Sequence, residues 1–171
     1  IPPPTQFYST GRGMVQPTVV RGSIGWPTDR GYFYVADAMQ LGKRFRLEAH
    51  RTIVSQASYL PGKFVVASID GFVYCVHEFT GELFWRFSTG VPISHSPVVI
   101  GESIYVIVDN GGMYRISGDS GIEKWWTPDI KKFISASKDR LYCIDRLGRI
   151  VILHAETGGR VASIPTEELD L

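Results

Sequence analysis

The stretch HEFTGELFWRF, residues 77 to 87, decides the fold because its pattern returns further along the chain. A Thr-Gly pair separates two apolar runs, and a tryptophan follows four residues after the glycine. SGIEKW repeats this arrangement, and TGGRVA repeats the glycine without the tryptophan. The repeated positions are Gly81 and Trp85, Gly121 and Trp125, and Gly158. Self-similarity at a nearly fixed period indicates a repeat architecture, so these residues are expected to be structural.

Each repeat is predicted to contain short antiparallel strands. SIYVIVD, residues 103 to 109, alternates apolar with small or polar residues, NGG supplies a turn, and MYRIS runs back as a second strand. After a second turn, IEKWW forms a third strand. No stretch keeps the apolar spacing of a helix beyond one or two turns. The sequence therefore predicts an all-β fold.

Gly121 follows Gly81 by 40 residues and Gly158 follows Gly121 by 37, which is the period of a β-propeller blade. One blade cannot bury both of its faces, whereas stacked blades can. Leu83 and Trp85 are expected to anchor one blade against the next. A degenerate first copy lacks the Thr-Gly pair and the tryptophan. We expect an extended lead-in at 1–13 and one domain at 14–171, with blades of four antiparallel strands near 14–57, 58–95, 96–133 and 134–171.

The segments VYCVHEFTGELFW, MYRISGDSGIEKW and IVILHAETGGRVA resemble the pyrroloquinoline-quinone-like (PQQ-like) repeats of β-propellers, in which a Thr-Gly turn accompanies a docking tryptophan. The resemblance is close over 60–164 and looser over 14–59. It implies a propeller that closes with about seven or eight blades, whereas this chain has room for about four. We expect a fragment of a longer propeller or a homodimer of half-propellers, in preference to a closed ring of four.

Three aspartates, Asp70, Asp109 and Asp145, align at the end of a strand before a glycine-containing turn if the turns differ in length by one residue. They are expected to form turns through their side chains. His77 and His154 stand four residues before the repeat glycine, where family members commonly carry Asp. Equivalent positions in separate blades are far apart, so we expect no shared metal site.

Catalytic and cofactor residues are not expected. Ser94, His95 and an aspartate supply the residue types of a hydrolase triad, but the chain has no GxSxG nucleophile elbow. The resemblance also extends to quinone-dependent dehydrogenases, which bind the quinone in the propeller funnel beside calcium and, in many cases, adjacent cysteines. Cys75 and Cys143 are far apart in the sequence, and we expect two buried, reduced thiols.

Charge and hydropathy limit the partners. The chain has 18 Lys and Arg residues against 17 Asp and Glu residues, so its net charge of +1 gives no electrostatic case for nucleic acid or an anionic membrane. No apolar run approaches the ~20 residues that a membrane-spanning helix needs.

The function expected from these observations is a non-catalytic scaffold that binds a protein partner in the cell envelope, as the outer-membrane-assembly scaffolds with these repeats do. The family's habits imply an extracytoplasmic, periplasmic location. The alternative is a fragment of a quinone-dependent dehydrogenase. Binding is expected in rim loops, at the turn that differs in length between blades. The candidate contacts are Asn110, Gly112, Met113, Arg146 and Arg149.

Overall fold

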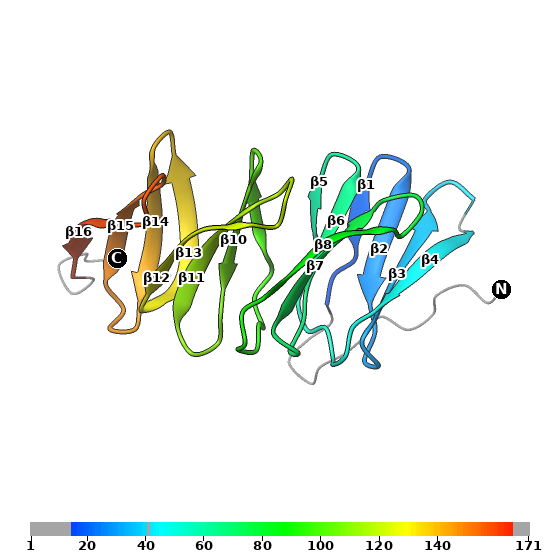
Figure 1. The fold of residues 1–171 in the computed structure, drawn as a ribbon, viewed down its shortest axis with the longest axis horizontal. Helices are drawn as coiled ribbons and strands as arrows, with labels where there is room; N and C mark the ends of the chain where they lie inside the picture. Colours follow the sequence, from blue (N-terminus) through cyan, green and yellow to red (C-terminus); the bar gives the residue numbers. More distant parts are fainter. Residues whose placement is uncertain (1–14, 41, 166–171) are drawn as a thin grey trace.

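The described part of the chain forms four sheets, each of four antiparallel strands. The computed structural model describes residues 15–40 and 42–165, so the expected lead-in at 1–13 lies outside the described residues. In every sheet the strands follow one another in chain order. The sheets stand side by side, from β1–β4 at one end to β13–β16 at the other (Figure 1). The all-β expectation with four propeller blades is confirmed.

The strand bounds are as follows. The first sheet has β1 (Thr18–Val20), β2 (Ser23–Pro27), β3 (Tyr32–Asp37) and β4 (Lys43–Glu48). The second has β5 (Ser58–Leu60), β6 (Lys63–Ala67), β7 (Phe72–His77) and β8 (Leu83–Ser88). The third has β9 (Val98–Ile100), β10 (Ser103–Ile107), β11 (Gly112–Ser117) and β12 (Glu123–Pro128). The fourth has β13 (Ile130–Ser137), β14 (Arg140–Asp145), β15 (Ile150–His154) and β16 (Arg160–Ile164).

The middle strands of an internal sheet are apolar on both faces because each face meets a neighbouring sheet. On the second sheet, Val65 and Cys75 pack toward the third sheet. Phe64 and Val76, which point the other way, pack toward the first sheet. All four side chains are fully buried. This burial on both faces explains why the strands read as nearly continuous apolar runs.

The repeated aromatic residues and glycines form one contact that joins every pair of neighbouring sheets. A Cβ atom at Gly121 would lie 2.5 Å from the Trp85 ring, and one at Gly158 would lie 2.6 Å from the Trp125 ring. Both glycines also have φ of 72°, a conformation that side chains disfavour. The indole N–H groups donate to the next sheet, Trp85 to Gly118 O at 3.0 Å and Trp125 to Ala155 O at 2.9 Å.

The degenerate first repeat uses a different aromatic residue for the same contact. Phe45 lies on Gly81, where a Cβ atom would be 2.6 Å from its ring. Phenylalanine has no N–H to donate, so this junction keeps the ring packing without the hydrogen bond. The first sheet is thus held by the same contact as the others, although its sequence motif is incomplete.

Two expectations need correction, and one alternative is excluded. Leu83 does not anchor neighbouring blades, because it is 45% exposed and does not belong to the core between the second and third sheets. The fourth sheet begins at Ile130, inside the range 96–133 expected for the third blade, because Asp129 alone connects β12 to β13. The alternative of a closed ring of four blades is also wrong, since the first and fourth sheets lie at opposite ends of the row (Figure 1).

The docking contact predicts different consequences for two adjacent tryptophans. Trp85→Ala and Trp125→Ala should each lower the free energy of unfolding by about 3 to 5 kcal/mol, because each removes a buried ring and leaves a cavity between sheets. Trp126→Ala is the matched control, since this ring is 49% exposed and its loss should cost much less. Urea unfolding followed by circular dichroism measures the difference. Equal losses for Trp125 and Trp126 would contradict the docking role.

Candidate functional site

The turn between the second and third strands has the same length in all four sheets. In each turn, the N–H of the first residue donates to the carbonyl oxygen of the residue four positions later. The N–H of the fourth residue donates to the carbonyl oxygen of the first. The turns comprise residues 28–31, 68–71, 108–111 and 145–148. The expectation that they differ in length is therefore wrong. Asp70, Asp109 and Asp145 occupy the third, second and first turn positions, so they are not equivalent residues.

The aspartates of the second and third sheets fix the segments that connect neighbouring sheets. Asp70 accepts the His50 N–H at 3.0 Å, and Asp109 accepts the Ser94 N–H at 2.8 Å. The Ser94 hydroxyl also donates to Asp109, and His95 Nδ1 lies 3.9 Å from the same carboxylate. The triad residue types therefore meet, but the serine bonds to the aspartate. In a catalytic triad the serine hydroxyl bonds to the histidine. Here Ser94 and Asp109 instead hold the connecting segment against the turn of the third sheet.

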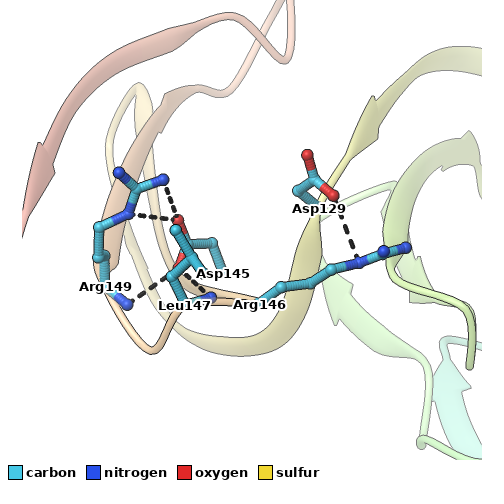
Figure 2. A pocket seen from close by; sticks show the side chains of 5 residues that line it. All are labelled: Asp129, Asp145, Arg146, Leu147 and Arg149. Carbon is cyan, nitrogen blue, oxygen red and sulfur yellow. Dashed lines mark hydrogen bonds and ion pairs between the residues drawn. The ribbon is translucent and has the colours of Figure 1, made fainter.

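A short connection distinguishes the fourth sheet from the second and third. Residues 49–57 and 89–97 connect the earlier sheets, and each segment inserts a fully buried isoleucine, Ile53 or Ile93. Between the third and fourth sheets only Asp129 remains, and it adopts a φ of 62°. An open pocket of about 250 Å³ lies there (Figure 2). It is lined by Asp129, Asp145, Arg146, Leu147 and Arg149.

Arg146 spans the gap left by the short connection. Its Nε lies 3.3 Å from Asp129 Oδ1, and its guanidinium donates to the Asn110 carbonyl of the preceding turn. Arg146 thus links the turns 108–111 and 145–148, which are the two turns predicted to bind a partner. Arg146 and Arg149 leave the turn in opposite directions (Figure 2). Arg146 remains half exposed and accessible to a partner.

Asp145 is the buried charge that holds the fourth turn in shape. Its carboxylate accepts the N–H groups of Leu147 and Arg149 at 3.0 and 2.9 Å. The Arg149 Nε donates to it at 2.8 Å, and Arg160 lies 3.9 Å away. Burial opposes ionisation, but the hydrogen bonds from Arg149 and Leu147 outweigh it and hold the pKa of Asp145 below its ordinary value. Asp145 therefore holds the Arg149 guanidinium in place, and the Arg149 side chain remains 39% exposed.

Two of the predicted contact residues do not reach the rim. Met113 is fully buried in the core between the third and fourth sheets. Gly112 is buried as well, and a Cβ atom there would lie 2.9 Å from the Trp126 ring. Both residues begin β11, where the chain leaves the turn and enters the buried part of the sheet. Their placement at a binding rim was wrong for this reason.

Leu147 is the surface residue that the sequence pattern did not single out. It stands at the third turn position and is 76% exposed. The other three turns carry polar residues there: Arg30, Asp70 and Asn110. An apolar side chain at a turn tip whose equivalents are all polar is the signal that could have identified it.

His77 and His154 shape the Thr-Gly turns. His77 Nδ1 accepts the N–H groups of Phe79 and Thr80 at 3.1 and 3.3 Å. His154 Nδ1 accepts the Glu156 N–H at 3.3 Å. In the first sheet Asp37 accepts the Met39 N–H at 2.8 Å from the equivalent position. These residues therefore share one local structural task.

The quinone-dehydrogenase alternative concerns the metal-ligating residue types and the two cysteines. Across residues 15–40 and 42–165, no three His, Cys, Asp or Glu side chains are grouped so as to hold a metal ion. Cys75 and Cys143 are free and buried in different sheets, and burial raises their pKa values to about 11 and about 12. The same described residues include no helix long and apolar enough to cross a membrane.

The buried carboxylate predicts a pH-dependent stability difference. Asp145→Asn should lower the free energy of unfolding by about 1 to 3 kcal/mol at neutral pH, because Arg149 loses its charged partner. The pKa of Asp145 is lowered in the folded state, so its contribution is complete above the ordinary value of 3.8 and disappears as the pH falls through the folded-state value.

Thermal unfolding of the variant and the wild type over a pH series tests this dependence. The gap between the two should narrow below about pH 4. Asp129→Asn is the matched control: its carboxylate is 54% exposed beside Arg146, and the change should matter little at any pH. A gap for Asp145→Asn that stays constant down to acidic pH would contradict the assignment.

Comparison with solved structures shows the same fold in proteins of different function. BamB from Moraxella catarrhalis matches with a TM-score of 0.74 at 16% identity, over 88% of this chain and 48% of that one. The quinohemoprotein alcohol dehydrogenase ADHIIG from Pseudomonas putida HK5 matches with 0.75 at 15%, over 89% and 34%. The computationally designed Ika8 protein matches with 0.75 at 14%, over 91% and 50%. This chain spans half or less of each, and such identities show the fold alone.

Sequence comparison identifies the family. Curated proteins gave no match. A family model described as outer membrane protein assembly factor BamB matches residues 20–168, which is most of the chain. The expected resemblance to PQQ-like propellers is thereby confirmed, and the chain belongs to the family that this model describes.

Proposed function

We propose that this chain is a non-catalytic interaction domain that binds a protein partner in the cell envelope, in an extracytoplasmic, periplasmic setting. The family match over residues 20–168 supports the scaffold role and the compartment. The observation that carries the binding site is the pocket at Asp129, where the connection between sheets is reduced to one residue. Propellers commonly bind through such irregular rim segments.

The side chains at the pocket suit a protein surface. Leu147 offers an exposed apolar group, and Arg146 and Arg149 stand on either side of it in the chain. Arginine is enriched among the residues that contribute most to protein interfaces. Because Asp145 and Asp129 hold the two guanidinium groups in place, a partner loses little side-chain entropy by binding there. The matching partner segment presents an apolar residue next to acidic ones.

Affinity capture followed by titration tests this function. The immobilised chain is incubated with an envelope extract, bound proteins are identified by mass spectrometry, and the recovered partner is purified and titrated by calorimetry. Leu147→Asp and Arg146→Ala should each weaken binding by about tenfold or more, as interface anchors do. Met39→Asp is the matched control, since Met39 is 86% exposed in the turn between β3 and β4 of the first sheet, away from the pocket.

The quinone-dehydrogenase alternative is examined in the same preparation. Alcohol dehydrogenases share the fold, so this alternative needs a direct test. Pyrroloquinoline quinone and Ca²⁺ are added, and dye-linked oxidation of alcohols is recorded. Partner binding that survives both pocket variants would refute the proposed site. Saturable quinone binding with dehydrogenase activity would refute the scaffold role itself.

A further inference from the structure

Trp126 is an exposed aromatic residue close to the pocket in the sequence. It stands in β12 three residues before Asp129 and is 49% exposed. The preceding residue, Trp125, is buried in the core between the third and fourth sheets. Because neighbouring residues of a strand point to opposite faces, Trp126 points away from that core and takes no part in docking. Its ring is therefore available to another molecule.

The exposed ring replaces a different arrangement in the first two sheets. There, an arginine of the fourth strand lies over the aromatic ring that begins the third strand. The two pairs are Arg46 over Tyr32, 4.4 Å from the ring centroid, and Arg86 over Phe72, at 5.1 Å. In the third sheet, Gly112 begins the third strand and Trp126 takes the register position of the arginine. This sheet thus presents an indole where the other two present a guanidinium.

Two consecutive glycines bring Trp126 and Arg146 to the same piece of backbone. A Cβ atom at Gly111 would lie 2.7 Å from Arg146 Nε, and one at Gly112 would lie 2.9 Å from Trp126 Nε1. The Arg146 side chain leads away from Leu147, its neighbour in the chain, to reach this turn (Figure 2). The guanidinium therefore lies between Leu147 on one side and Trp126 on the other.

We infer that Trp126 is an apolar anchor for the protein partner proposed above, and that the partner segment carries an acidic residue between two apolar ones. The inference rests on the proposed function and adds a contact residue and a sequence pattern to it. Leu147 and Trp126 each receive one apolar side chain. The Arg146 guanidinium between them receives the carboxylate, because hydrogen bonds between these two charged groups are strong.

The charges around the guanidinium favour an acidic partner. Arg146 is 51% exposed, and its carboxylate neighbour, Asp129, is 54% exposed. The other carboxylate of the pocket, Asp145, is 2% exposed and bonded to Arg149. Tryptophan and arginine are among the residue types most enriched where binding energy is concentrated in protein interfaces. An uncovered indole beside a half-exposed guanidinium therefore suits an acidic and apolar protein segment.

A library of random 12-residue peptides displayed on phage is the probe, and the immobilised chain selects from it. Enriched peptides should share an acidic residue flanked by apolar ones. One enriched peptide is then synthesised and titrated by calorimetry. Trp126→Ala should weaken its binding by about tenfold or more, as the loss of an interface anchor does. Phe79→Ala is the matched control, on a ring that is 54% exposed in the turn between β7 and β8.

Two further measurements separate direct contact from an effect on folding. Trp126→Arg introduces the residue type that the first two sheets carry at this position, so it should fold and still bind weakly. In nuclear magnetic resonance spectra, the Trp126 indole N–H signal is assigned by its absence from Trp126→Ala. This signal should shift when the peptide is added, whereas the signal of the buried Trp85 should not. Changing the acidic residue of the peptide to its amide should weaken binding to the wild type but not to Arg146→Ala.

The outcomes distinguish this inference from the proposed function. Binding that Arg146→Ala and Leu147→Asp weaken, but that leaves the Trp126 signal and the affinity of Trp126→Ala unchanged, would overturn the inference and leave the pocket in place. Selection of no peptide, or of peptides without an acidic residue, would also overturn it, and capture of an envelope protein then decides the proposed function separately. A Trp126 signal that shifts with protein concentration alone would indicate a second copy of the chain as the occupant, against the inference.

Discussion

An aromatic ring lying on a glycine of the next sheet is the contact on which the rest of the structure depends. Each of the first three sheets supplies a ring from the third residue of its last strand, and the following sheet supplies a glycine with positive φ and no room for a side chain. The ring sets the distance and angle between sheets, and the apolar middle strands then bury their facing residues. Trp85 and Trp125 also bond to the next sheet through the indole N–H.

Repetition of this contact leaves the variable parts of the chain free for function. The turns that carry the repeat glycines take part in docking, and His77, His154 and Asp37 shape the backbone of the equivalent turns. At the other end of the sheets, the turns have constant length but changing side chains. The single-residue connection at Asp129 then removes the segment that covers the equivalent turns. Function in this fold is thus expected where the repeat is interrupted.

Local pattern was sufficient for most of the fold and for part of the site. The alternation in 103–117 and the spacing of the glycines predicted strands, turns and blades, because these depend on neighbours in the chain. The structure brings Arg146, Arg149 and Asn110 together at these turns, and binding there stays a prediction. Met113, expected in the same loops, is buried. The error arose because one residue decides whether a strand end faces solvent or core. The turns looked unequal only because their aspartates occupy different positions.

The sequence by itself determined the all-β class, the repeat, the docking aromatic residues and the glycines that receive them, since these follow from periodicity and backbone sterics. Tertiary structure alone decided three further matters. Phe45 replaces tryptophan at the first junction, Leu147 is exposed beside two anchored arginines, and Trp126 and Arg146 lie on consecutive glycines. Whether an apolar side chain is buried depends on which sheet lies opposite it, and that is a property of the assembled molecule.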